Sequence, residues 1–132
     1  MRIKTYVAFS VLFCVALFFV GCEKDTLMTE MKRVIPVIEG ATVLKSYLPN
    51  EKMAVMELEV DASKVPQKAI LDFYQNTLTK QGWESKGIKD YGKNGSLMEL
   101  KKKDWGTLSV QTITKKTDKT GKIPFVLSLS LD

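Results

Sequence analysis

Histidine is absent from the 132 residues, and this absence narrows the chemistry open to the chain. Histidine is the commonest general base in enzymes and the commonest nitrogen ligand of transition metals, so most hydrolase and metalloenzyme sites are excluded. The sequence also lacks a glycine-rich nucleotide loop, a Ser-x-x-Lys motif and a Gly-x-Ser-x-Gly motif. We therefore expect a protein that is not an enzyme and that holds no metal or other cofactor.

A strong surplus of either charge is also missing, and the chain is short. At about 100–200 residues per domain, 132 residues make one domain and exclude a two-domain enzyme. Hydrophobic residues make up 45% and charged residues 27%, as in globular rather than disordered proteins. Of the 20 basic residues, Arg2 and Lys4 lie at the N-terminus, so 18 basic and 15 acidic residues follow. This small surplus argues against a dedicated nucleic-acid binder.

The N-terminus has the pattern of a secretory signal peptide. Two positive charges in residues 1–4 precede an apolar run of 14 residues, Val7 to Val20. About 20 apolar residues are needed to cross a membrane as a helix, so the run is short for a permanent span. The alternative is an uncleaved anchor that borrows Thr5, Tyr6 and Gly21 for length.

The residues that end this run indicate the kind of signal. The segment Phe19-Val20-Gly21-Cys22 resembles the lipobox of bacterial lipoprotein precursors, with Phe19 where the family usually has leucine. The resemblance implies that the Cys22 sulfur receives a diacylglyceryl group and that a signal peptidase cuts between Gly21 and Cys22. It also implies that the new amino group accepts an acyl chain such as palmitate. The other interpretation of Cys22 is an ordinary small apolar residue at the end of a hydrophobic run.

Lipidation would anchor the protein to a membrane without spanning it. Each buried CH₂ contributes about 0.8 kcal/mol, so one acyl chain binds reversibly, whereas two or three hold a protein in place. By resemblance to lipoprotein sorting, aspartate after the lipidated cysteine favours the inner membrane, and here the residue is Glu23. We therefore expect the periplasmic face of the outer membrane where the host has one. Cys14 would leave with the signal peptide, so the folded part would have no thiol for disulfides, catalysis or metal binding.

The chain is expected to divide into a signal peptide (1–21), the lipidated cysteine with a tether (22–33) and a single domain (34–132). The segment 23–33 is charged and has no sustained hydrophobic period, which is typical of a tether, with at most one or two frayed helical turns, that holds a domain off the lipid surface. We therefore expect the fold to begin near Val34.

Hydrophobic periodicity predicts the elements of this domain. One long amphipathic helix is expected between a cap at Asp61 or Ser63 and a stop at Gly82, with Pro66 in its first turn. Strands are expected on both sides of it, at residues 42–48, 53–60, 83–89, 96–102, 105–115 and 125–131. The order ββαββββ predicts an α+β fold, an antiparallel sheet of about five to six strands with one long helix on one face.

Two short patterns in this region resemble a module of small exported bacterial lipoproteins of unknown function. In that module a proline-glycine segment, here Pro36 and Gly40-Ala41, precedes a helix marked by Phe-Tyr and ending in Gly-Trp, here within DFYQNTLTKQGW (residues 72–83). The resemblance covers residues 35–83. It implies the fold and brings no activity with it.

Three groups of residues are candidates for a site. Glu57 and Glu59 lie two apart on a strand, so their Cα atoms are about 6.5–7 Å apart on one face, which suits a paired-carboxylate site or a hard cation. The other interpretation is a solvated strand face paired with lysines. Phe73, Tyr74 and Trp83 could line a ligand pocket, although a stripe at helical spacing is typical of a core.

Lysines form the third group. Together with Trp105 they could build a basic surface for anionic lipid headgroups or envelope polymers, at about 1 kcal/mol per lysine near a charged membrane. Alternatively they protect exposed edges and turns from aggregation. The lysines concerned are Lys101, Lys102, Lys103, Lys115, Lys116, Lys119 and Lys122.

These patterns favour a lipid-anchored envelope protein that presents a small non-enzymatic binding or adaptor module to an unidentified envelope protein or ligand. The alternative is a periplasmic carrier of a small or lipidic ligand, which needs a cavity of at least about 300 Å³ lined by leucine, methionine and aromatics. A third hypothesis, a hydrolase using Glu57 and Glu59, requires both carboxylates in one cleft.

Overall fold

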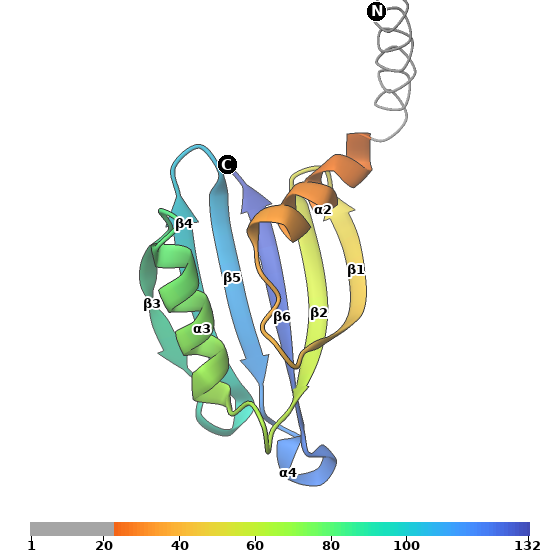
Figure 1. The fold of residues 1–132 in the computed structure, drawn as a ribbon, viewed down its shortest axis with the longest axis vertical. Helices are drawn as coiled ribbons and strands as arrows, with labels where there is room; N and C mark the ends of the chain where they lie inside the picture. The colour runs from red at the N-terminus through yellow and green to blue at the C-terminus, as the bar shows by residue number, and fades with distance from the viewer. Residues whose placement is uncertain (1–22) are drawn as a thin grey trace, which may run out of the picture.

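Six strands form one antiparallel sheet in the computed structural model, which describes residues 23–132 (Figure 1). Across the sheet the strand order is β1-β2-β6-β5-β4-β3, and every neighbouring pair is antiparallel. The predicted α+β class and antiparallel sheet are confirmed. The elements in chain order are α2 (Glu23–Val34), β1 (Thr42–Asn50), β2 (Met53–Asp61), α3 (Gln67–Thr79), β3 (Glu84–Asp90), the 3₁₀ helix η1 (Gly92–Asn94), β4 (Gly95–Lys102), β5 (Gly106–Ile113), α4 (Thr117–Thr120) and β6 (Lys122–Leu131).

Alternation along the central strands decides which face of the sheet is buried. Successive residues of a strand point to opposite faces, so apolar residues at every second position create one apolar face. In β2, Glu57 and Glu59 lie half-buried on the opposite, open face. The buried positions on the apolar face of β2 and its neighbour β6 are Ala54, Met56, Leu58, Val60, Ile123, Phe125, Leu127 and Leu129, and Val55 of β2 is buried on the other face.

The central helix is shorter than predicted. α3 has 13 residues, Gln67–Thr79, so the expectation of one long helix reaching from Asp61 or Ser63 to Gly82 is wrong. Pro66 sets its start, because proline has a fixed φ and no N–H and so suits the position before the first turn. The Asp61 carboxylate instead accepts hydrogen bonds from the Ser63 backbone N–H (3.0 Å) and hydroxyl (2.7 Å), which hold the turn between β2 and α3.

A second helix occupies the segment predicted as a tether. α2 covers Glu23–Val34, and Met31 near its end is fully buried in the core, as is Ile35 just after it. Leu27 and Met28 pack against the same core. The structure therefore places the start of the folded unit inside α2, not near Val34 as predicted. The short helix α4 lies between β5 and β6, so the order in the described residues contains two α-helices, α2 and α4, and the 3₁₀ helix η1 beyond the predicted ββαββββ.

Both α2 and α3 lie on the apolar face of the sheet (Figure 1). Between them, the segment of residues 35–41 runs from α2 to β1 over the same face. Tyr74 of α3 is fully buried at the centre, with its ring centroid 6.1 Å from Phe125 and 4.9 Å from Phe73. Its hydroxyl oxygen accepts a hydrogen bond from the Ile38 backbone N–H at 3.3 Å. Since Trp83 is buried as well, these aromatic residues belong to the core.

Tyr74 also makes the free energy of unfolding decrease at high pH. Burial raises its pKa well above 10, an effect opposed only in part by the Ile38 hydrogen bond. In the unfolded chain the phenol ionises near pH 10, so above this value the unfolded state loses a proton that the folded state keeps. The stabilisation is complete below pH 10 and is lost as pH rises.

We expect Tyr74→Phe to reduce this loss. The variant should cost about 1–2 kcal/mol at neutral pH, because the Ile38 N–H loses its partner. Between pH 9 and 11, however, its free energy of unfolding should fall less steeply than that of the wild type. Urea denaturation across this range measures both values. Parallel pH profiles for the two proteins would contradict a buried, protonated Tyr74.

Candidate functional site

Cys22, the predicted lipid-attachment residue, and the predicted signal peptide (1–21) lie outside the described residues. The description starts one residue after Cys22, at Glu23 in α2. α2 begins at the end of the sheet that carries the β1–β2 and β4–β5 turns and the C-terminus (Figure 1). We call this the α2 end, and the opposite end, with the loop that contains α4, the α4 end.

The lysines predicted to share a surface with Trp105 separate into two groups. Residues 101–103 and Trp105 surround the β4–β5 turn at the α2 end, whereas residues 115–122, with the other four lysines, form the loop at the α4 end. One basic surface that includes both groups is therefore not formed. β5 separates them: at about 3.4 Å per residue, its eight residues extend about 27 Å.

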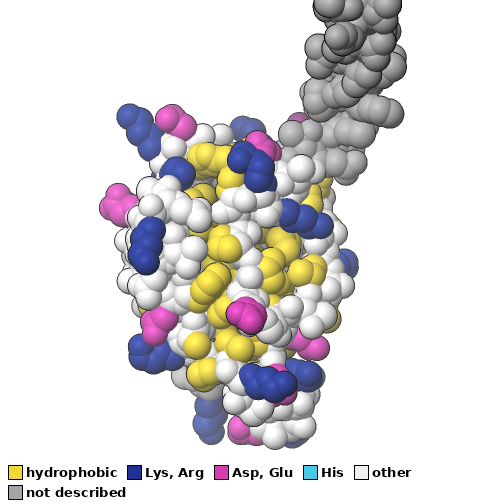
Figure 2. Space-filling model, in the orientation of Figure 1, with side chains coloured by type: hydrophobic (Ala, Val, Ile, Leu, Met, Phe, Trp, Pro, Cys, Tyr) yellow, Lys and Arg dark blue, Asp and Glu magenta, His cyan; other side chains and the backbone are white. Residues whose placement is uncertain are grey.

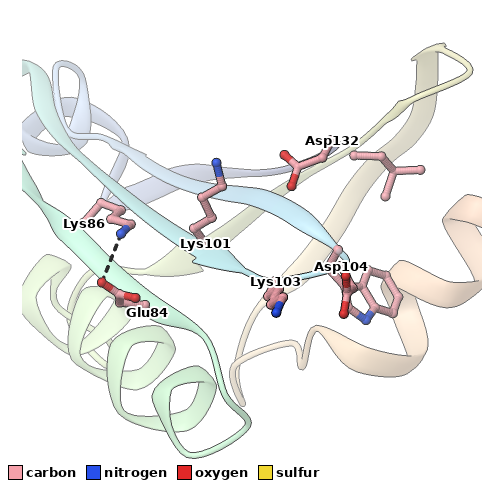
Figure 3. Close-up of a pocket in the computed structure, with 8 residues that line it drawn as sticks. Glu84, Lys86, Lys101, Lys103, Asp104 and Asp132 are labelled. Atoms are coloured by element: carbon pink, nitrogen blue, oxygen red, sulfur yellow. Dashed lines mark hydrogen bonds and ion pairs between the residues drawn. The ribbon is translucent and has the colours of Figure 1, made fainter.

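A broad pocket of about 720 Å³ lies at the α2 end (Figure 3). Its charges are mixed, with three lysines and three carboxylates, and the Lys86 ammonium pairs with the Glu84 carboxylate at 3.0 Å. The formal side-chain charges of its lining residues therefore sum to zero. The lining residues are Glu84, Lys86, Lys101, Lys103, Asp104, Trp105, Leu131 and Asp132.

A second pocket, of about 340 Å³, lies at the α4 end, and we call it the α4 pocket. Three exposed lysines and one half-buried glutamate border it, together with two half-buried apolar residues and a threonine. Figure 2 shows lysine and arginine side chains around this lower end of the molecule. The lining residues are Glu59, Ile113, Lys115, Lys116, Thr120, Lys122 and Pro124.

Hydrogen bonds within the loop hold the border of the α4 pocket in place. The Thr117 hydroxyl donates to the Lys122 carbonyl oxygen at 2.9 Å, and the Lys122 N–H donates to the Thr120 hydroxyl oxygen at 3.1 Å. The Thr114 hydroxyl donates to the Lys93 carbonyl oxygen at 2.9 Å, which ties the loop to η1. Gly121 ends α4 in the left-handed region, at φ 72°. The backbone that carries the lysines is therefore fixed, while their side chains stay in solvent.

Glu57 and Glu59 share the open face of the sheet but line no common pocket in the described residues. Glu59 borders the α4 pocket, whereas Glu57 lies opposite Lys45 of β1. Near Glu57, the Lys45 ammonium lies 4.9 Å from the Tyr47 ring centroid. Desolvation and a hydrogen bond to Glu57 raise the pKa of Tyr47. The two carboxylates therefore belong to different surroundings.

Ile113, Pro124 and Thr120 were not among the predicted site residues. A sequence signal for Ile113 exists, because it is the one aliphatic side chain on the open face of β5, after Thr107, Ser109 and Gln111. For Pro124 the sequence has no such signal. Its position opposite Glu59 depends on the pairing of β6 with β2, which the sequence pattern does not specify. Only the assembled sheet brings these residues beside the lysines.

Comparisons with protein-family models, curated proteins and solved structures found no match to this chain. Among residues 23–132, no group of three or more cysteine, aspartate or glutamate side chains is arranged to hold a metal ion. The helices of the same range are all too short or too polar to cross a membrane. The α4 pocket, with its uneven charge, is the strongest candidate for a binding site in the described chain.

Proposed function

We propose that this protein is a bacterial envelope lipoprotein, anchored through acyl chains on Cys22, whose domain is a non-enzymatic binding or adaptor module. The lipobox-like residues Phe19 to Cys22 support the anchor. By resemblance to lipoprotein sorting, Glu23 after the cysteine favours the periplasmic face of the outer membrane in a host that has one. The α4 pocket supports the binding role.

The position of α2 is the observation that carries this proposal furthest. α2 begins at the residue after Cys22 and is fixed to the core by the buried Met31. Its 12 residues extend about 18 Å, so an acyl anchor on Cys22 would lie close to the α2 end. The domain would then be held with its α2 end toward the lipid and its α4 pocket toward the envelope space.

The packing of the helix–sheet layer favours a binding module over the alternative, a carrier with a ligand inside the fold. Large side chains fill this layer, and Tyr74, Phe125 and Leu78 in it are fully buried. The pockets of about 720 and 340 Å³, in contrast, lie at the ends of the sheet. A ligand would therefore bind at the surface.

Labelling of intact cells with a fatty-acid analogue tests the anchor. We expect the wild-type chain to take up label and to partition into detergent, and the Cys22→Ala chain to lose label to background and to keep its signal peptide. Cys14→Ala is the matched control, since it removes the other cysteine and should label like the wild type. An unlabelled wild-type protein with a free Cys22 thiol would refute the proposal.

A further inference from the structure

The surplus positive charge of the described chain is concentrated in one loop. Residues 23–132 contain 18 basic and 15 acidic side chains. Residues 115–122 alone contain four lysines and one aspartate, so the rest of the range 23–132 has 14 of each sign. This loop borders the α4 pocket through Lys115, Lys116, Thr120 and Lys122. The formal surplus of +3 therefore lies at one end of a domain that is otherwise neutral.

Nearby carboxylates compensate only a small part of the positive charge of this loop. Among residues 27–132, whose side chains the structure describes, the ion pairs are Arg33–Glu30, Lys68–Asp72 and Lys86–Glu84, and none of these pairs involves a pocket lysine. Asp61 lies opposite Lys122 in the sheet, and its pKa is lowered first by its hydrogen bonds to Ser63 and then by Lys122 and Lys64. Asp61 thus compensates part of one lysine. Asp118 and Glu59 are the other nearby carboxylates.

The residues that line the α4 pocket suit a ligand that has both a negatively charged group and an apolar group. Three lysines and Glu59 give the α4 pocket a net charge of +2, which matches a phosphate monoester that carries two negative charges. Ile113 and Pro124 are half-buried and offer apolar surface beside these charges. The volume of about 340 Å³ falls within the range of small-molecule sites. An inorganic ion would leave the apolar surface in water, and a neutral apolar molecule would leave the lysines unused.

We propose that the α4 pocket binds an organic phosphate monoester whose phosphate lies among Lys115, Lys116 and Lys122 and whose apolar group covers Ile113 and Pro124. This assignment rests on the binding role proposed above and names its ligand class. It does not depend on acylation of Cys22. A soluble metabolite and the headgroup of an envelope lipid can both carry such a group.

Calorimetric titration of the full chain in detergent with 1-naphthyl phosphate tests the assignment. We expect binding at least about tenfold tighter than that of inorganic phosphate or of 1-naphthol, because only the ester uses both halves of the site. The affinity should fall as salt is raised. Equal affinities for the ester and for inorganic phosphate would overturn the proposal.

Two sets of variants locate the binding. Lys115→Gln with Lys116→Gln should weaken 1-naphthyl phosphate at least about tenfold, whereas Lys101→Gln with Lys103→Gln, which removes the same charge at the α2 end, should leave it unchanged. Ile113→Ser should remove the preference for the ester over inorganic phosphate. Equal losses in the two lysine variants would assign the binding to overall charge and refute the site. Thermal unfolding identifies any variant that is misfolded.

Two further experiments distinguish a soluble phosphate ligand from a lipid headgroup, and failure of the lipid anchor from failure of the α4 pocket. Cys22→Ala should bind 1-naphthyl phosphate like the wild type, so failed acylation with intact binding would overturn only the lipid anchor. Failed binding in an acylated protein would overturn only the α4 pocket. Cosedimentation of Cys22→Ala with phosphatidic acid vesicles in excess of that with phosphatidylcholine vesicles, with the excess lost when Lys115→Gln and Lys116→Gln are added, would assign the phosphate to a lipid headgroup. Binding to 1-naphthyl phosphate without such cosedimentation would assign it to a soluble ligand.

Discussion

Replacing Gly95 with alanine is expected to lower the free energy of unfolding by about 3–5 kcal/mol. Gly95 starts β4 with φ at 121°, a conformation that residues with a side chain rarely adopt. A Cβ atom there would lie 1.9 Å from the Thr112 carbonyl oxygen and 2.7 Å from its carbonyl carbon. Both are backbone atoms of β5, so the sheet itself must move to admit the methyl group.

The neighbourhood of Gly95 makes such a movement costly. Ser96 and Thr112 are the buried polar residues of the described chain, and the Gln67 side-chain amide donates to both hydroxyl oxygens at 2.9 Å. The Ser96 N–H also donates to the Thr112 hydroxyl oxygen at 3.0 Å. A shift of β4 against β5 would strain all three bonds, and a buried polar group without a partner costs about 1–3 kcal/mol.

Gly121→Ala is the matched control for Gly95→Ala. Gly121 also has a positive φ, 72°, but a Cβ atom there would meet nothing within 4 Å. Gly121→Ala should therefore lower the free energy of unfolding by only about 1–2 kcal/mol, from backbone strain alone. Urea denaturation followed by tryptophan fluorescence compares the two variants. Similar losses of stability in Gly95→Ala and Gly121→Ala would show that the close approach of the β5 backbone to Gly95 does not add to the cost of the substitution.

Met31→Ala should destabilise the domain by about 2–5 kcal/mol, the usual cost of truncating a large buried side chain to alanine. Met31 has no exposed surface, and it joins α2 to the core formed by α3 and the sheet. Hydrogen exchange should also show that the amides of α2 lose protection in the variant, because few other contacts fix this helix.

Met28→Ala on the same helix provides the comparison. Met28 is half-buried and packs against the edge of the core, so its loss should cost clearly less than that of Met31. If residues 23–33 formed a solvated tether, both substitutions would be nearly neutral. A loss below about 1 kcal/mol for Met31→Ala would therefore restore the tether interpretation.

Strands were the part of the fold that sequence patterns predicted best. One face of the sheet is buried and the other is largely open, so the alternation of apolar and polar residues in β6, and in β2 from Met56 onward, reflects burial directly. α2 was missed because its apolar residues are few among charged ones, and only packing against the sheet shows that Met31 belongs to a core. α4 has four residues, too few for any periodic signal.

The lysine clusters show why a candidate site is harder to predict than a fold. Lys103 and Lys115 are close along the chain, and their separation in space depends entirely on β5 being extended between them. Conversely, Ile113 and Pro124 meet the lysines only after β6 has paired with β2 on one side and β5 on the other. The identity of Cys22 as an acylated residue, in contrast, is a prediction from sequence alone.

The packing of α2 also bears on how such a protein would be released from a membrane. Proteases cleave extended chain, and the segment from Glu23 to Val34 is helical, with Leu27, Met28 and Met31 held against the core. A protease must wait for α2 to undock and unwind before it can cut there. In a chain anchored through Cys22, proteolytic release of the domain would thus be slow, and it would be faster in a variant whose α2 packs more weakly on the sheet.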